Sequence, residues 1–235
     1  MTNTSFFTVF NLYDEKEATQ IFDLVIGREW EPGKARTPEL TDQLKHNLEL
    51  KMVGAKKGEK DLMTEILKNH AKRLADNTDI KTLHIVKGVS PPKFNRYVAP
   101  GGDYRRHTDS PVMAGVRTDL ACTTFLSNPE DCDGGELNIE DHYGNVHSFK
   151  GERGQCVVYP CGQPHWVSPV TRGERVSIVC WMQSYIRDIH KRQLLSGMIK
   201  SLSKIEEMAG QDQVIRDVWT EMGSTHAALF KMWME

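Results

Sequence analysis

The feature that most restricts the fold is a change in the sequence pattern near Leu83. From there the chain is built of short β-prone runs separated by glycine, proline and aspartate. These runs lie at 94–98, 118–127, 135–140, 145–150, 155–159, 165–170 and 175–184. Many short strands with turn residues between them are typical of a sandwich or jelly roll. The central part of the chain therefore predicts a β core.

Helical patterns precede this core. The first begins at Asp14, where Glu17 completes a capping-box pattern, and it ends near Gly27. Its predicted apolar face carries Ala18, Ile21, Leu24 and Val25. Two further patterns show apolar residues at helical spacing, one opened by Pro38 with Leu40, Leu44 and Leu48, and one with Leu62, Ile66, Leu67 and Leu74.

Helical patterns also follow the core. Apolar residues recur at helical spacing from Leu194 to Ile205, Gly210 interrupts the pattern, and a second helix is predicted through Trp219 to Trp233. We expect these helices to cover the β core, and a homodimer contact is the alternative use of their apolar faces.

The chain of 235 residues is long enough to bury one sizeable core, and no internal repeat or linker requires a division. We therefore predict a single domain of the α+β class over 1–235. Its expected parts are an N-terminal helical support at 1–82, the β core at 83–185 and C-terminal helices at 186–235.

Charge and cysteine content restrict the setting. Thirty basic and 32 acidic residues give a net charge of -2, so no overall attraction to nucleic acid or anionic lipid is expected. The sequence shows no signal-peptide pattern and no apolar run of about 18 residues, so no membrane partner is expected. Five scattered cysteines fit reduced thiols better than a disulfide framework. These features predict a cytoplasmic protein.

The chemistry is concentrated in four residues. His107 and Asp109 are two positions apart, so on an extended backbone both side chains project from the same face. His165 opens a later β run, and Arg175 follows ten residues after it within another. Their order along the chain is His-x-Asp, His and then Arg.

This donor set suits one kind of metal chemistry. Two imidazoles and one carboxylate on one side of an octahedral ion leave three adjacent positions open, as Fe(II) needs when it binds a chelating 2-oxo acid and dioxygen. Arg175 can bind the far carboxylate of such an acid, because a guanidinium forms a planar bidentate pair and stays charged when buried.

Each residue taken alone has a more ordinary explanation. A single histidine such as His107 is more often a surface or core residue, and an arginine in a strand is more often exposed. Cys156, Cys161 and His165 could instead contribute to a zinc site. However, no second close cysteine pair accompanies them, and the alternation in 155–159 favours Cys156 as a small core residue.

A resemblance to a known family extends over nearly the whole chain. It is carried by Phe94-Asn-Arg-Tyr97, His107-x-Asp109, Arg117-Thr-Asp119-Leu120, Gly134-Gly-Glu-Leu137, Tyr159-Pro160 and His165-x-x-x-Pro169-Val-Thr-Arg-Gly173. Lys45-His-Asn47, Trp181-x-Gln183-Ser184, Arg187-Asp188 and Leu229-Phe-Lys-Met-Trp233 add to it. The chain resembles the bacterial PKHD-type hydroxylases, which include the iron-uptake-associated PiuC proteins and are similar to the prolyl 4-hydroxylase catalytic domain.

The resemblance implies a double-stranded β-helix core, related to jelly rolls and cupins. It implies an Fe(II) centre at His107, Asp109 and His165, with 2-oxoglutarate bound by Arg175. By the same correspondence Tyr97 contacts the co-substrate, and a hydroxyl from Thr123 or Thr124, with Thr124 preferred, adds to that contact. Family descriptions also mention L-ascorbate, for which no residue here can be named.

The expected function is hydroxylation. Such an enzyme consumes dioxygen and 2-oxoglutarate and releases succinate and carbon dioxide, here with peptidyl proline or another small or peptidic molecule as substrate. The alternatives are a non-catalytic iron-binding sensor on a cupin-like fold and a cupin-like enzyme that uses another metal and no 2-oxo acid. Arg175 favours the hydroxylase, because neither alternative needs a buried arginine that pairs with a dicarboxylate.

Overall fold

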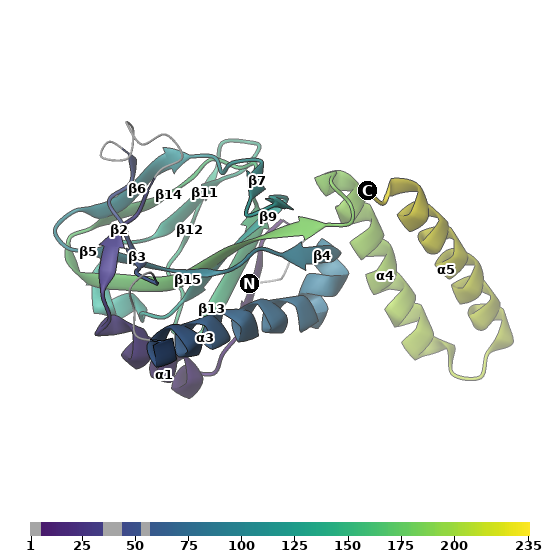
Figure 1. The fold of residues 1–235 in the computed structure, drawn as a ribbon. Helices are drawn as coiled ribbons and strands as arrows, with labels where there is room; N and C mark the ends of the chain where they lie inside the picture. Colours follow the sequence, from purple (N-terminus) through teal and green to yellow (C-terminus); the bar gives the residue numbers. More distant parts are fainter. Residues whose placement is uncertain (1–5, 35–43, 53–56) are drawn as a thin grey trace.

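Two antiparallel sheets form the core of the protein (Figure 1). The computed structural model describes residues 6–34, 44–52 and 57–235. The larger sheet has the strand order β1-β13-β9-β15-β5-β3-β2, with β4 and β10 also paired to β15. Its strands are β1 (Thr8–Asn11), β2 (Trp30–Pro32), β3 (Leu48–Leu50), β4 (Val86–Val89), β5 (Lys93–Val98), β9 (Leu120–Phe125), β10 (Cys132–Asp133), β13 (Gln155–Pro160) and β15 (Arg172–Ser184).

The smaller sheet has the order β12-β11-β14-β6. Its strands are β6 (Gly102–His107), β11 (Leu137–Glu140), β12 (Val146–Phe149) and β14 (His165–Val170), and β7 (Val112–Met113) and β8 (Val116–Arg117) form a separate hairpin. Buried residues of the two sheets, among them Phe125 on β9 and Ile139 on β11, pack against each other. The observed architecture confirms the predicted jelly-roll core.

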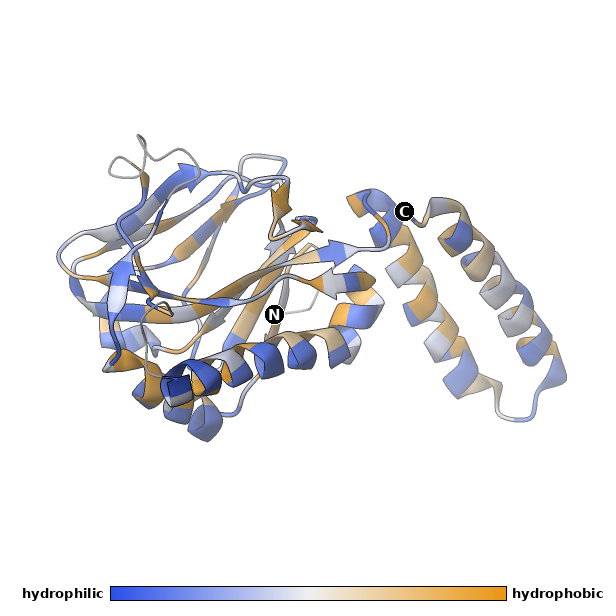
Figure 2. Cartoon of the chain, in the orientation of Figure 1, coloured by the Kyte–Doolittle hydropathy of each residue, from blue (hydrophilic) through white to orange (hydrophobic). Residues whose placement is uncertain are grey.

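The outer face of the larger sheet is covered by two helices, α1 (Glu15–Ile26) and α3 (Lys57–Asp76). Alternate residues of each strand face opposite sides, so the strands supply apolar residues both to these helices and to the interior between the sheets. The hydropathy colouring shows the division, with hydrophobic colour along the central strands and mostly hydrophilic colour on the outward sides of the two helices (Figure 2).

Several local predictions are confirmed. All seven predicted β runs contain strands of the two sheets. Helix α1 begins after Asp14, whose side chain accepts a hydrogen bond from the backbone N–H of Glu17, and Gly27 ends the helix. Of its predicted apolar face, Leu24 is 36% exposed and lies at the edge.

The N-terminal third is less helical than predicted. β1, β2 and β3 all lie within 1–82, and Leu48, predicted as helical, begins β3. Leu40 lies outside the described residues. The reason is tertiary, because β3 pairs with β5 and so satisfies backbone groups along an edge that the larger sheet would otherwise expose.

The C-terminal helices exist as predicted but do not cover the barrel. α4 (Ile189–Ala209) and α5 (Gln213–Trp233) form an antiparallel hairpin that extends from one end of the sheets (Figure 1). α5 buries no residue fully, and contact with the body is made near Ile186 and Leu195, which pack with Phe230 and Trp233. The apolar face of α5 is matched to α4 rather than to the sheet.

All five cysteines are buried free thiols, as the odd and scattered count predicted. Within the described part of the chain, none of the helices combines the length and the apolar character needed to cross a membrane.

Candidate active site

A cavity of about 580 Å³ lies within the barrel. It is lined by His107, Asp109 and His165 together with Tyr97 and Arg175. Five of the residues singled out from the sequence therefore meet in one place, although they come from four separate segments of the chain.

The three predicted metal ligands converge because β6 and β14 are neighbours. His107 is the last residue of β6, His165 is the first residue of β14, and the two are directly paired. Asp109 follows β6 by two residues. Its Oδ1 lies 3.8 Å from Nε2 of His107, and its Oδ2 lies 3.5 Å from Nε2 of His165. One ligand atom from each residue lies within 4.8 Å of the other two.

Backbone carbonyls orient both imidazoles. Nδ1 of His107 lies 2.7 Å from the carbonyl oxygen of Arg105, and Nδ1 of His165 lies 2.9 Å from that of Gln163. A carbonyl can only accept, so each Nδ1 carries a proton, and in the neutral ring the lone pair is then on Nε2, the nitrogen nearer Asp109. This is the tautomer that a metal ligand requires.

The electrostatics also favour a neutral imidazole at His107. Burial, with a smaller effect from His165, lowers the pKa of His107 to about 4. The ring of Tyr104 stacks on His107 with the centroids 3.6 Å apart, and Tyr159 meets His165 edge-on at 5.3 Å. Two neutral nitrogens and one carboxylate, held rigidly on one side of a cavity, fit a divalent ion such as Fe(II).

Arg175 is a buried cation that forms no ion pair with a carboxylate in the described part of the chain. It is 4% exposed, and within the described chain its guanidinium makes one hydrogen bond, from NH1 to Oγ of Ser177 at 3.1 Å, while Nε has no partner. The guanidinium lies over the rings of Tyr97 and Phe125, 5.2 and 5.1 Å from their centroids. Burial lowers the pKa of Arg175, so an anionic ligand would stabilise its charge. The residues present therefore fit a bound dicarboxylate.

The prediction for Thr124 is wrong in its placement. Residues of β9 alternate between the two faces, and Thr123 lines the cavity whereas Thr124 does not. Thr124 pairs with Ile178 and Cys156, which belong to the core on the helix-covered side. Thr123, the other threonine considered, supplies its hydroxyl to Tyr159.

The two cysteines considered for a zinc site lie in different parts of the fold. Cys156 belongs to the core beneath the helices, whereas Cys161 belongs to the core between the sheets. The thiol of Cys161 instead donates to Oδ2 of Asp109 at 3.1 Å.

Sequence reasoning missed other residues of the cavity. The indole of Trp181 donates to Asp109, and Lys45 and Lys93 line the same cavity. Trp181 is six positions after Arg175 on one strand. Because side chains alternate between the two faces of a strand, this even spacing alone predicts that both lie on the same face. For Lys45 no local signal existed, because it reaches the site through an isolated bridge between its backbone and that of Tyr104.

Comparison with known proteins agrees with this geometry. The model of the 2OG-Fe(II) oxygenase superfamily matches residues 92–183, the segment that holds all of the predicted site residues. A PKHD-type hydroxylase of Acidovorax ebreus is 34% identical over 189 residues, which are 78% of this chain and 80% of the relative. Another, from Acinetobacter baylyi, is 32% identical over 235 residues, 96% of this chain and 97% of the relative. The chain belongs to the PKHD-type hydroxylases.

Members of this family are 2-oxoglutarate-dependent oxygenases, so the chain is an oxidoreductase of that class, and the family implies Fe(II) and 2-oxoglutarate.

Solved structures support the fold. A Pseudomonas putida prolyl-4-hydroxylase is 20% identical with a TM-score of 0.53, covering 76% of this chain and 92% of that one. A prolyl hydroxylase from Trichoplax adhaerens is 19% identical with a TM-score of 0.58, covering 83% and 88%. Family membership confirms the hydroxylase expectation over the sensor and cupin alternatives.

Proposed function

We propose that His107, Asp109 and His165 hold Fe(II) in this hydroxylase and that Arg175 binds the C5 carboxylate of 2-oxoglutarate. The observation that carries the proposal is the buried guanidinium of Arg175, which forms no ion pair with any described residue and lies in the same cavity as three side chains that could hold a metal ion. A buried charge is costly unless a partner compensates it, and the dicarboxylate is that partner.

When bound, Fe(II) and 2-oxoglutarate would together activate dioxygen, which is the oxidant, and succinate and carbon dioxide would be the by-products. The remaining tasks belong to this chain. The carbonyls behind His107 and His165 keep both Nε2 atoms available, and the rings around Arg175 exclude water from its contact with the carboxylate. Tyr97, whose pKa burial raises, stays a neutral phenol beside that contact.

For the substrate we propose a peptidyl proline or another small or peptidic molecule. Support comes from the structural neighbours, which are described as prolyl hydroxylases, and the one from Trichoplax adhaerens was solved with a peptide fragment of a hypoxia inducible factor. L-ascorbate enters the proposal only as a general reductant, since no described residue is assigned to it.

Three further features belong to the proposal. A cytoplasmic setting is supported by the five free thiols. A single domain over 1–235 is supported by β1, β2 and β3, which join the N-terminal part to the core sheet. A homodimer through the helical hairpin is supported by three exposed apolar residues on α4 and α5, Leu194, Val214 and Val218. Light scattering would measure the molar mass and so the oligomeric state.

The test is an anaerobic titration of the metal-free protein with Fe(II) and 2-oxoglutarate. A weak visible metal-to-ligand charge-transfer band should develop only when both are present, because it requires the chelate. Succinate release in air, stimulated by a substrate, then measures turnover. A protein that binds both compounds without the band would contradict the proposed chelate at His107, Asp109 and His165.

A further inference from the structure

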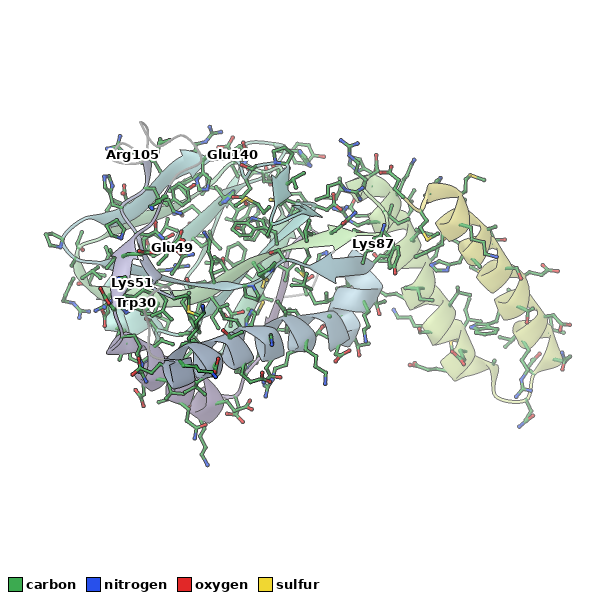
Figure 3. The ribbon with its side chains drawn as sticks, viewed as in Figure 1. Trp30, Glu49, Lys51, Lys87, Arg105 and Glu140 are labelled. Atoms are coloured by element: carbon green, nitrogen blue, oxygen red, sulfur yellow. The ribbon has the colours of Figure 1, made fainter. Side chains whose placement is uncertain are left out.

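Two lysines in the cavity share a single carboxylate oxygen. Nζ of Lys45 lies 2.7 Å from Oε1 of Glu49, and Nζ of Lys93 lies 2.9 Å from the same atom. Glu49 is on β3, at the side of the barrel formed by β2, β3 and β5 (Figure 3). One negative charge therefore faces two positive charges.

Both ammonium groups lie close to the metal ligands. Nζ of Lys93 lies 5.6 Å from the ring centroid of Trp181, whose indole N–H is bonded to Asp109. Nζ of Lys45 lies 5.4 Å from the ring centroid of Tyr104, which stacks on His107. One aromatic ring thus separates each ammonium group from a predicted iron ligand.

The two lysines differ in the hydrogen-bonding capacity that remains. Lys45 has a side chain only 7% exposed, and it also donates to the backbone carbonyl of Lys34 at 3.4 Å. Lys93 has a side chain 34% exposed, and in the described part of the chain its single hydrogen bond goes to Glu49. An ammonium group has three N–H donors, so Lys93 can donate a further hydrogen bond to an acceptor in the cavity.

The charge of the cavity lining also favours an anionic ligand. Its described lining holds four cationic side chains, Lys34, Lys45, Lys93 and Arg175, against the carboxylate of Asp109. Fe(II) and the 2-oxoglutarate dianion cancel each other, so even with Glu49 included the described residues around the loaded cavity keep an excess of positive charge. Burial and then the neighbouring Lys93 lower the pKa of Lys45, so an anion placed beside the two lysines would stabilise its charge.

We propose that the substrate carries a carboxylate near the carbon that is hydroxylated, and that Lys93, with Lys45 behind it, receives this carboxylate beside the metal. The inference rests on the proposed Fe(II) and 2-oxoglutarate site and adds the substrate class. Arg175 is already committed to the co-substrate, so Lys93 is the cation with free donors that an incoming substrate meets.

The experiment compares small acids with their neutral amides on the anaerobic Fe(II) and 2-oxoglutarate complex. The probes are N-acetylproline, N-acetylglycine and N-acetylleucine, each beside its primary amide, with inorganic phosphate as a separate anion. Binding near the iron is followed as a shift of the charge-transfer band. For the wild-type protein we expect at least one acid to act at about tenfold lower concentration than its amide.

The variants are Lys93→Gln, Lys93→Arg and the matched control Lys51→Gln. Lys51 is equally exposed at 35% and also forms an ion pair, with Glu29 at 2.6 Å, but it does not line the cavity. The preference for acid over amide should disappear in Lys93→Gln and persist in Lys93→Arg and in Lys51→Gln. Thermal unfolding of each variant checks that the fold is kept.

The outcomes separate this inference from the proposed function. Failure of the band to form in the wild-type protein would overturn the Fe(II) and 2-oxoglutarate site itself. A normal band with no acid preferred over its amide, or a preference unchanged in Lys93→Gln, would overturn the carboxylate site alone. Stronger binding of inorganic phosphate than of every acid would show that the anion is a phosphate and would also overturn it.

Discussion

The indole Nε1–H of Trp181 donates a hydrogen bond to Oδ2 of Asp109 across 2.9 Å. The thiol of Cys161 donates to the same oxygen at 3.1 Å. Because two donors occupy Oδ2, Oδ1 is the carboxylate oxygen left free for a metal. Trp181 is therefore expected to act as a positioning residue for Asp109, the proposed metal-binding carboxylate.

Trp181→Phe keeps an aromatic ring but removes the N–H. Loss of such an outer hydrogen bond typically lowers metal affinity by about 10- to 100-fold. We expect weaker binding of Fe(II), or of Co(II) as a spectroscopic substitute, measured by titration at fixed pH. Trp219→Phe, at a partly exposed position on α5, is the control. Equal metal affinity in wild-type protein and Trp181→Phe would show that the hydrogen bond has no positioning role.

Arg175→Gln should weaken 2-oxoglutarate binding while leaving metal affinity nearly unchanged, because the proposed role of Arg175 is to bind the co-substrate and not the metal. Removing one partner of a buried charge pair costs about 2–5 kcal/mol, and the lower end corresponds to about a 30-fold loss of affinity. Arg175→Lys should lie between the two, since an ammonium keeps the charge but lacks the bidentate fork. The measurement is 2-oxoglutarate titration of the Fe(II) protein, and equal affinity in wild type and Arg175→Gln would remove Arg175 from the co-substrate site.

His165→Ala and Asp109→Ala should each abolish most turnover and lower Fe(II) affinity, because two ligands direct a metal poorly and Asp109 is the proposed anionic ligand. His190→Ala, at an exposed position on α4, is the matched control for the loss of an imidazole. Iron binding by equilibrium dialysis and succinate release measure the two effects. Wild-type iron affinity in either site variant would be incompatible with the proposed centre.

The metal-free protein should lose stability as the pH falls from about 6.5 toward 4. Burial lowers the pKa of His70 and His84 to about 3 and, with His165, that of His107 to about 4, so the unfolded chain takes up protons that the folded chain refuses. Each such histidine contributes about 1.4 kcal/mol per pH unit within the window between its folded and unfolded pKa. Three together give a slope of up to about 4 kcal/mol per pH unit.

Urea unfolding in the presence of a chelator, at pH 7, 6 and 5, measures this slope. His107→Gln should reduce it by about one third. A free energy of unfolding that does not vary between pH 6.5 and 5 would show that these histidines are not kept neutral by the fold.

The sequence by itself determined the parts of this protein that depend on short-range patterns. The period-two runs and their turn residues predicted the strands that build both sheets, and Asp14, Glu17 and Gly27 marked the ends of α1 because capping acts over three or four residues. The His-x-Asp motif, the later histidine and Arg175 were recognisable from order and spacing, and the cavity brings all four together.

Tertiary structure decided what depends on partners far along the chain. Leu48 became a strand residue because the edge of β5 was open to it, and α5 packs on α4 rather than on the barrel. Thr123 rather than Thr124 faces the cavity, because strand register selects which of two adjacent residues points inward. Lys45 and Lys93 meet at one oxygen of Glu49 only after strand pairing brings distant segments side by side, and no local pattern encodes that meeting.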